Sequence, residues 1–462
     1  MTLEPLLDRD AELSVLQESS QAAAAGTPQL VVVWGRRRVG KTFLLSHLVQ
    51  GKRGVFYGAT EQAEGVELGR LAEAVRRDLG DSVFDLAGGG FASWEAALRF
   101  FVALARDDPI VVVLDEVPYL LRSTPGFASI VQAVWDHVPK GTKLMLVLTG
   151  SAVGTIESLL GGGGALRGRP TRALRLDPLG PVEARTFLPR LDAVGFLEAY
   201  AACGGYPLHL KRWDPSATTH QNLLHLAVTP GGILLEDAAG ILREELPDVG
   251  GYPRILAAIG RGRTRMSEIA NEADQRVEHP IEVLLRTGFV RRMVPIGAPR
   301  RAWPLYELAD AYLAFWFGVL YSDLPQIEAG QGRAVLKRRT EQWQRQLGWI
   351  FEEAARGHAV RLVSQGRLPP DLVVGRWWAT TGEPCEIDVL GLRGGRSVLL
   401  GEARWQPRPL GARDLRDLIG KSARLPRPID EPIFALWGRG GVEPDVVRSG
   451  ALGFDVEDVL RA

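Results

Sequence analysis

The sequence predicts an α/β protein in which a parallel-sheet nucleotide-binding domain precedes a helical lid, a winged helix and a second α/β domain. Three observations carry this prediction. Short apolar runs alternate with helical stretches between Leu30 and Leu176, a glycine-bounded loop at Gly35–Thr42 follows the first run, and new apolar runs begin beyond residue 340. Apolar runs that alternate with amphipathic helices are typical of a parallel sheet covered on both faces.

The strands expected in the first domain are continuous apolar runs. They lie at Val31–Trp34, Val55–Tyr57, Ile110–Leu114, Leu144–Thr149 and Ala173–Leu176. Four glycines, Gly161–Gly164, come before the last of them. We expect a mobile loop there, because glycines offer no side chains to pack.

After Pro178 the pattern becomes helical and predicts a lid. Helices are expected at Pro181–Leu188 and Phe196–Cys203, and Gly204–Pro207 ends the second. Three shorter helices and two strands follow, at Tyr252–Ile259, Met266–Glu272, Pro280–Thr287, Phe289–Pro295 and Trp303–Leu308. This is the order of a winged helix.

The aromatic segment Tyr306–Tyr321 predicts a buried helix, and Glu328–Arg339 predicts a charged linker. The last domain is expected to contain a helix, two strands, a helix and a strand, at Gln342–His358, Cys385–Leu392, Ser397–Arg404, Ala412–Ala423 and Pro432–Leu436. The predicted bounds are 1–177 for the nucleotide-binding domain, 178–247 for the lid, 248–310 for the winged helix, 311–339 for helix and linker, and 340–462 for the second α/β domain.

Composition limits the classes of function. The formal net charge of the 462 residues is zero, so any contact with nucleic acid must come from local basic patches. Cys203 and Cys385 are the only cysteines, which excludes a disulfide framework and a cysteine-rich zinc site. No signal peptide or apolar run of roughly 20 residues is present, so we expect a cytoplasmic protein without a membrane partner.

The segment Gly35-Arg36-Arg37-Arg38-Val39-Gly40-Lys41-Thr42 lies between a strand and a helix that continues with Phe43. Backbone N–H groups of such a loop cradle phosphates, the lysine reaches the outer phosphates, and the hydroxyl ligates Mg²⁺. Only seven lysines stand among the 55 basic residues, so Lys41 does not follow from composition. The segment predicts a site for a nucleoside triphosphate.

Two further strands end in polar residues. Val111–Glu116 ends in Asp115, expected to hold the Mg²⁺ shell, and Glu116, expected to activate the attacking water. Leu144–Ser151 ends in Ser151. Ser151 either contacts the γ-phosphate or the attacking water, or caps the next helix, and both alternatives stay open. Thr149 is a lesser candidate.

Arg167 and Arg169 follow the four glycines. A cation there would stabilise charge on the transferred phosphoryl group, in the same subunit or in a neighbour, whereas a solvated surface arginine is the plain alternative. We prefer Arg169, for the reason given by the resemblance below.

The ordered set of motifs resembles the archaeal-type AAA ATPases, relatives of the signal-transducing P-loop ATPases, which carry a C-terminal domain of unknown function. The matching segments are Asp8–Leu13, Gly35–Thr42, Leu114–Glu116, Leu148–Ser151, Gly168-Arg169, Gly204–Pro207 and Tyr306–Phe317. The resemblance implies ATP binding and hydrolysis with Mg²⁺, Arg9 on the adenine side, Arg169 near the phosphates and Gly204–Pro207 near the nucleotide. A plain interhelical turn remains the alternative for Gly204–Pro207.

The C-terminal domain resembles a PD-(D/E)XK nuclease core. Glu352 on a helix, Asp388 on one strand and Glu402 on the next would bind Mg²⁺. Such sites carry a lysine where this chain has Arg404, and arginine cannot lose its proton to act as a base. Lys421 on the following helix is an alternative source of the amine, and Asp371 is an alternative acid. The nuclease is therefore either active or degenerate.

The winged helix offers the arginines Arg261, Arg263, Arg265, Arg291, Arg292, Arg300 and Arg301 as phosphate contacts, although winged helices also dock proteins. We expect an ATPase that drives or switches a DNA-interacting, nuclease-like domain. The alternatives are a nucleotide-gated, metal-dependent DNA nuclease and a non-catalytic, ATP-dependent signalling or scaffold protein. A homo-oligomer or a protein partner is compatible with each of these readings.

Overall fold

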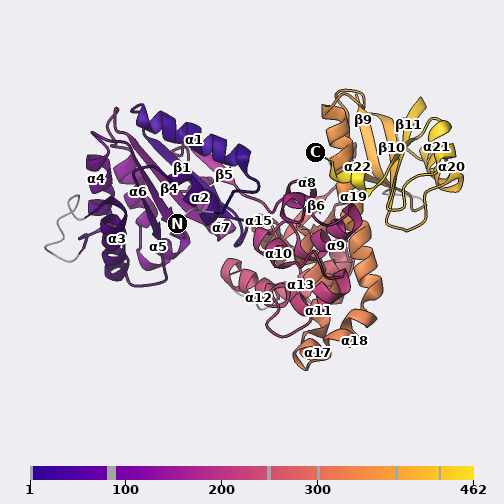
Figure 1. Ribbon diagram of the computed structural model, residues 1–462, viewed down its shortest axis with the longest axis horizontal. Coiled ribbons are helices and arrows are strands. Elements are labelled where there is room, and N and C mark those ends of the chain that lie inside the picture. Colours follow the sequence, from indigo (N-terminus) through magenta and orange to yellow (C-terminus); the bar gives the residue numbers. More distant parts are fainter. Residues whose placement is uncertain are drawn as a thin grey trace. The chain divides into compact units, whose positions relative to one another are not determined.

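The computed structural model describes residues 4–80, 90–246, 251–298, 302–379, 383–425 and 428–461, without the side chains of residues 428–431. The chain divides into two compact units, Met1–Pro178 and Leu179–Ala462. Each unit has its own sheet and its own buried core. Figure 1 shows the elements of both units.

Unit 1 contains a sheet of five parallel strands in the order β2-β3-β4-β1-β5. Its strands are β1 (Gln29–Trp34), β2 (Gly54–Gly58), β3 (Ile110–Asp115), β4 (Leu144–Gly150) and β5 (Arg172–Arg175). The runs β1, β3 and β4 are almost entirely buried, as expected for strands covered on both faces. The fold class predicted from the sequence is confirmed for this unit.

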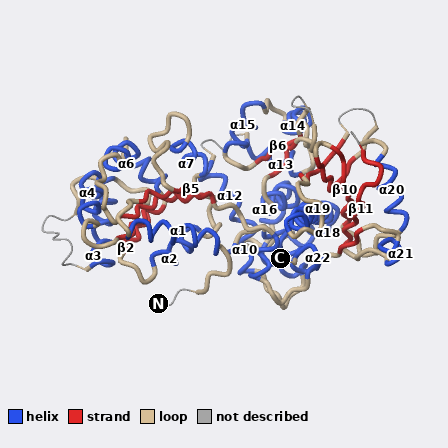
Figure 2. The backbone as a smooth tube through the Cα atoms, turned by 90° about the horizontal axis from the view of Figure 1, so that it is seen from above, coloured by secondary structure: helices blue, strands red, loops and turns tan. Residues whose placement is uncertain are grey.

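Helices cover both faces of this sheet. They are α1 (Asp10–Ala24), α2 (Lys41–Val49), α3 (Glu64–Leu79), α4 (Trp94–Leu104), α5 (Val117–Ser123), α6 (Phe127–Trp135) and α7 (Val153–Leu160). Figure 2 shows α1 and α2 on one side of the strands and α4 and α6 on the other. One continuous core joins alternate residues of β1, β3 and β4 to Leu71, Phe101 and Phe127 of α3, α4 and α6.

The four glycines form a folded turn, not the loose loop that we expected. Gly161 N donates to Glu157 O at 2.9 Å, and Leu166 N donates to Leu159 O at 3.1 Å, so the segment folds back on the end of α7. A Cβ atom at Gly164 would lie 2.2 Å from Leu159 O. The glycine at this position is therefore required by close backbone packing.

Unit 2 begins with short helices. They are α8 (Pro181–Ala184), the 3₁₀ turn η2 (Arg185–Phe187), α9 (Ala193–Cys203), α10 (Pro207–Arg212), α11 (Thr219–Leu226) and α12 (Ile233–Glu245). Gly204–Pro207 turns between α9 and α10. A Cβ atom at Gly205 would lie 1.9 Å from Leu179 O, so this turn packs directly on the chain that enters the unit.

The winged-helix order is present. It consists of α13 (Tyr252–Gly260), α14 (Met266–Ala273), α15 (Glu278–Arg286) and the antiparallel pair β6 (Val290–Met293) and β7 (Leu305–Leu308). The aromatic segment then forms α16 (Ala311–Phe315), a π-helical turn η3 (Trp316–Leu320) and a 3₁₀ turn η4 (Tyr321–Asp323). Tyr312, Phe315 and Phe317 are buried there, as predicted.

The segment expected to be a linker is helical. It contains the last residue of α17 (Leu324–Glu328) and all of α18 (Gly332–Arg338), which leads into α19 (Thr340–Ser364). Asp323 holds this junction by accepting hydrogen bonds from Arg338 at 2.9 Å and Arg339 at 2.6 Å. Some of the charges that suggested a linker thus form ion pairs within the fold.

The second sheet has the strand order β12-β11-β10-β9-β8 and is mixed. Its elements are β8 (Val373–Trp378), β9 (Glu386–Arg393), β10 (Arg396–Arg404), α20 (Ala412–Ser422), β11 (Pro428–Gly438), α21 (Pro444–Arg448), β12 (Leu452–Phe454) and α22 (Val456–Leu460). Helices α19 and α20 both pack on strands β9 and β10. We did not predict β8, β12, α21 or α22.

Within the described residues, every helix is too short or too polar to cross a membrane.

Candidate functional site

The loop Gly35–Thr42, which is predicted to bind phosphates, lies at the carboxyl edge of the unit 1 sheet, between β1 and α2. Arg38 and Gly40 adopt left-handed backbone conformations, with φ of 69° and 97°. Such turns direct successive N–H groups toward one point, which suits an anion. Arg36 and Val39 are buried, which anchors the loop.

Gly35 is required where β1 leaves the sheet. A Cβ atom there would lie 2.0 Å from Leu176 O, the carbonyl that follows β5. Leu176 N also donates to Trp34 O at 2.7 Å, so the two chain segments touch along their backbones. The first glycine of the motif therefore allows the loop to rest against β5.

Lys41 is almost fully buried at the start of α2. Its Nζ donates to Gly35 O at 2.7 Å and to Arg36 O at 3.0 Å. The ammonium group thus lies along the inside of the loop whose N–H groups are expected to bind phosphates.

Thr42 and Asp115 meet although 73 residues separate them. Thr42 Oγ1 donates to Asp115 Oδ2 at 2.8 Å, and Asp115 Oδ1 accepts from Glu116 N at 3.0 Å. Burial raises the pKa of Asp115, although the bond from Thr42 and the charge of Lys41 oppose this rise. A hydroxyl and a carboxylate side by side at a phosphate loop form an oxygen-rich pair of the kind Mg²⁺ prefers.

Glu116 stands at the start of α5 in a left-handed conformation, with φ of 57°. Strained backbone in a residue other than glycine is concentrated at functional sites. Its Oε2 accepts from Ser151 N at 3.0 Å and from Ser151 Oγ at 2.8 Å. Ala152, not Ser151, precedes α7 and makes no side-chain cap, so the capping alternative for Ser151 does not hold.

Arg9 lies at the same edge of the sheet. Its Nη2 donates to Asp177 O, just beyond β5, and its Nη1 pairs with Glu12 at 2.8 Å. The ring of Phe43 packs against that of His47 on α2, with the ring centres 4.5 Å apart and the planes tilted by 59°. Thr149 is fully buried in β4.

Arg169 lies at the opposite edge. It forms a two-bond pair with Asp136 at 2.8 Å, and its neighbour Thr171 donates from its N–H to Leu30 O, at the start of β1. The strand separates Leu30 from the loop by roughly 13 Å, at about 3.3 Å per residue. Of the two alternatives that we expected, this position does not fit a contact with phosphates of the same chain and leaves a contact with a neighbouring subunit. Arg167 is exposed nearby.

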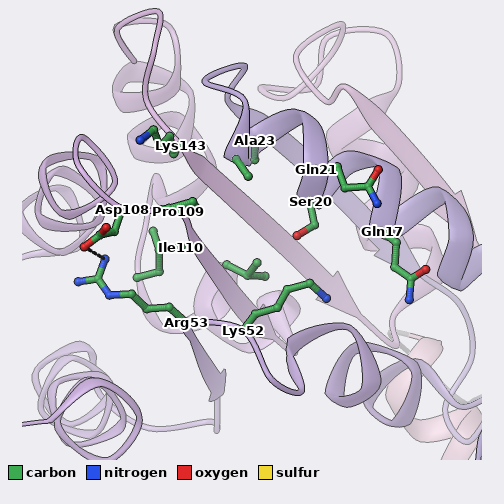
Figure 3. A pocket seen from close by; sticks show the side chains of 12 residues that line it. Gln17, Ser20, Gln21, Ala23, Lys52, Arg53, Asp108, Pro109, Ile110 and Lys143 are labelled. Atoms are coloured by element: carbon green, nitrogen blue, oxygen red, sulfur yellow. Dashed lines mark ion pairs between the residues drawn. The ribbon is translucent and has the colours of Figure 1, made fainter.

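A cavity of about 820 Å³ opens at this amino edge, not at the phosphate loop. Lys52, Arg53 and Lys143 line it, and Arg53 approaches Asp108 at 4.0 Å (Figure 3). Burial lowers the pKa of Lys52. The cavity is thus separate from the loop and carboxylates that are predicted to bind the nucleotide.

In unit 2, two of the three predicted carboxylates, Glu352 and Asp388, lie close together. Glu352 of α19 and Asp388 and Glu386 of β9 bring ligand atoms within 4.8 Å of one another. Burial first, and then the charge of Asp388, raise the pKa of Glu352 to about 8. Burial and the charge of Glu402 raise the pKa of Asp388 to about 6. Carboxylates forced together in this way favour a bound cation.

We did not predict Glu386. It lies two residues before Asp388 on the same strand, and residues two apart point to the same face of a sheet. This alternation of side chains along the strand was the sequence signal for Glu386. Glu402 lies outside this trio, although its charge reaches Asp388, whose Oδ2 accepts from Ala403 N at 3.0 Å.

Both basic candidates contact Glu402. Lys421 Nζ of α20 lies 2.6 Å from Glu402 Oε2, and Arg404 donates to Glu402 Oε1. The amine of Lys421 therefore lies next to Glu402, the place that we considered for a replacement of the lysine missing at position 404. Asp371 is exposed, and none of the described residues pairs with it.

Several arginines of the winged helix are engaged within the protein. Arg261 and Arg263 both pair with Glu272, and Arg291 pairs with Glu307 at 3.0 Å and Glu353 at 2.8 Å. Arg265 and Arg292 are exposed. Arg300 and Arg301 lie outside the described residues. The basic patch available for phosphates is thus smaller than the sequence suggested.

Comparison with known proteins finds matches to two protein families in the chain. A family described as an ATPase domain predominantly from Archaea matches residues 6–212. A family described as archaeal and bacterial proteins of unknown function matches residues 316–416. The second match contains Glu352, Asp388 and Glu402.

Similar proteins are also found over most of the chain. An uncharacterized protein of Methanocaldococcus jannaschii is 26% identical over 468 residues, which span 98% of this chain and 99% of the relative. A Walker-type ATPase of Pyrococcus abyssi is similar in structure, with a TM-score of 0.49, 19% identity, and coverage of 68% of this chain and 99% of that one. The ORC2 protein of Aeropyrum pernix gives a TM-score of 0.42, 15% identity, and coverage of 73% and 97%. The chain therefore carries, in residues 6–212, a member of the ATPase domain family found predominantly in Archaea and, in residues 316–416, a member of a family of archaeal and bacterial proteins of unknown function.

Proposed function

We propose that unit 1 hydrolyses ATP at the carboxyl edge of its sheet, with Lys41 on the outer phosphates, Thr42 and Asp115 at the metal and Glu116 at the attacking water. The 2.8 Å contact between Thr42 and Asp115 carries this proposal, because it joins the two halves of the site. The family match supplies the ATPase class.

Thr42 and Asp115 fit Mg²⁺ because both offer oxygen ligands, and a cation would favour the charged form of the buried carboxylate. When bound, Mg²⁺ would neutralise charge on the β- and γ-phosphates. The left-handed turn through Arg38 and Gly40 would present N–H groups to the same phosphates.

Glu116 is suited to orient the attacking water. Both bonds from Ser151 fall on Oε2, and among the described residues none donates to Oε1. Oε1 therefore has the capacity to accept a hydrogen bond from water, while Ser151 fixes the carboxylate. In this proposal Ser151 is a positioning residue, and Arg9 belongs to the rim near the base of the nucleotide.

The test is steady-state ATP turnover and binding of a fluorescent ATP analogue. Glu116→Gln should keep binding and lose turnover by at least about a hundredfold, because the amide cannot accept a proton. Lys41→Ala should lose both. Lys140→Ala, at an exposed lysine away from the loop, is the matched control and should behave as wild type. Equal turnover in all four proteins would refute the assignment.

We propose as a second activity that the carboxylates of unit 2 bind a divalent cation and cleave phosphodiesters, under control of the ATPase. The 2.6 Å contact of Lys421 with Glu402 favours this reading over a degenerate site. Glu352, Glu386 and Asp388 would hold the cation, and Lys421 would supply the amine that Arg404 cannot. A bound cation would activate water or polarise the phosphate.

Incubation of labelled DNA with Mn²⁺ or Mg²⁺ and ATP tests this activity. Cleavage should disappear in Asp388→Ala and fall strongly in Lys421→Met, while Asp417→Ala, at an exposed acid of α20, should cleave normally. Loss of ATP dependence in Lys41→Ala would support the coupling. Intact DNA in all samples, with partner affinity that responds to ATP, would favour the signalling or scaffold alternative.

A further inference from the structure

Two cavities lie within unit 2 and share Tyr306 of β7. The first, of about 450 Å³, lies between the winged helix, α19 and β8, and its lining includes Thr264, Arg345, Trp349, Glu352 and Arg376. The second, of about 570 Å³, continues along the winged helix, and its lining includes Arg265, Ser267, Trp303 and Trp378. Glu352 also belongs to the carboxylate trio, so the first cavity reaches that site.

Aromatic side chains line both cavities. Trp303 is 84% exposed, and such a large apolar side chain in water marks a contact surface when it adjoins a cavity. The guanidinium carbon of Arg376 lies 5.9 Å from the ring centre of Trp378, and that of Arg291 lies 5.5 Å from the ring centre of Trp349. Arginine against tryptophan is the arrangement on which nucleobases also stack.

The available positive charge lies beside these rings. Arg345 is exposed, and its side chain has no ion pair or hydrogen bond with the residues that the structure describes. Arg265 is exposed in the second cavity. Arg376, by contrast, is held by Glu307 at 2.8 Å and by Glu386. The two exposed arginines are the candidates for phosphate contacts.

We infer that the two cavities bind a single strand of nucleic acid, with bases stacked on Trp303 and Trp378 and phosphates against Arg265 and Arg345. Stacking on a side chain requires an unpaired base with an open face, which a duplex does not offer. Each cavity has the volume of a small-ligand site, enough for one or two nucleotides. The bound nucleic-acid strand would lead to Glu352. Binding in the cavities does not depend on the proposed phosphodiester cleavage, and the inference rests on that proposal only for the reaction at the carboxylates.

Fluorescence anisotropy of the full-length protein tests binding without cleavage. The probes are a labelled 15-nucleotide oligo(dT) and a duplex of the same length, both in EDTA. The single strand should bind at least tenfold more tightly. Trp303→Ala should weaken that binding roughly 5- to 30-fold, and Trp303→Phe should restore most of it, since a phenyl ring still stacks.

Arg345→Glu should also weaken binding and lower the salt dependence, whereas Arg333→Glu, at an exposed arginine of α18 that lines neither cavity, should not. Equal affinity for strand and duplex, or no effect of Trp303→Ala in a protein with unchanged thermal stability, would overturn the inference. Absence of nucleic-acid binding would overturn it too and would leave these cavities to a protein partner.

The two proposals fail differently. Cleavage of duplex DNA that depends on Asp388, without preferential binding of single strands, would refute the inference and keep the nuclease. Binding of single strands that depends on Trp303, without cleavage that depends on Asp388, would keep the inference and refute the nuclease.

Discussion

Position 404 shows how one residue type changes the chemistry expected of a site. Arg404 stays protonated and acts as a charge, while an amine of lysine can lose its proton in a buried setting. Lys421 reaches the same carboxylate from α20, on the opposite oxygen of Glu402. In the proposed cation site, the two roles that one lysine would combine would therefore be divided between Arg404 and Lys421.

His358 is a buried histidine of α19 that should stay neutral. Trp437 Nε1 donates to its Nδ1 at 3.0 Å, and the ring packs edge-on against Phe454. Burial first, and then the charges of Arg361 and other arginines, lower the pKa of His358 to about 4. Its protonation in the folded state is thus disfavoured at neutral pH.

A lowered pKa of His358 makes stability depend on pH. In the unfolded chain its pKa is about 6.5, so between 6.5 and 4 the unfolded state binds the proton more readily. The contribution of neutral His358 to the free energy of unfolding is complete above pH 6.5. It declines as the pH falls and is lower by about 2 kcal/mol at pH 5. Urea unfolding at pH 7.5 and 5 should show a smaller loss in His358→Gln, which keeps an acceptor for Trp437. Equal losses would contradict this pKa.

At the scale of elements, α18 shows why a segment rich in charge and glycine is a packed helix and not a linker. Gly332 begins this helix against the segment after α11, and a Cβ atom there would lie 1.9 Å from Val228 O. The composition of 328–339 is polar, yet Val335 is fully buried and Arg338 and Arg339 pair with Asp323. Packing against distant segments made the helix, which local composition could not indicate.

Gly332→Ala should therefore destabilise unit 2 by about 2–3 kcal/mol, because backbone cannot move aside as a side chain would. Gly240→Ala is the matched control. Gly240 lies within α12 with nothing within 4 Å of the added Cβ, so the substitution should stabilise by about 0.5–1 kcal/mol. Urea unfolding followed by circular dichroism measures both. A neutral Gly332→Ala would show that α18 tolerates displacement.

At the scale of the whole molecule, the chain contains two units with separate cores. The loop Gly35–Thr42 and the carboxylates of Asp115 and Glu116 lie entirely in Met1–Pro178, while the trio around Glu352 lies in Leu179–Ala462. A ligand that binds one native unit stabilises that unit through its own binding equilibrium.

Calorimetry of the full chain should accordingly show two unfolding transitions. An ATP analogue with Mg²⁺, at about 100 times its dissociation constant, should stabilise one of them by about 2.7 kcal/mol and raise its midpoint by several degrees. Lys41→Ala should abolish this shift and leave the other transition in place. A single transition that moves as a whole would instead indicate one cooperative body.

The sequence by itself predicted the residues of the proposed nucleotide site, because they are local to strand ends. In a parallel sheet all strands end at one edge, so Lys41, Asp115 and Ser151 must meet once β1, β3 and β4 pair. Glu352, Asp388 and Glu402 were grouped by the resemblance of the C-terminal domain to a nuclease core, and the winged helix followed from the order of its elements.

Only the tertiary structure decided which charges remain available. Arg169 pairs with Asp136 at the amino edge of the sheet, and Arg261, Arg263 and Arg291 form ion pairs within unit 2. Glu386 joins the carboxylate trio, and Lys421 contacts Glu402. These contacts join residues through turns and packing angles that no local pattern contains. Backbone periodicity sets the strands and helices, but the partner of a long, charged side chain depends on the three-dimensional arrangement of those elements.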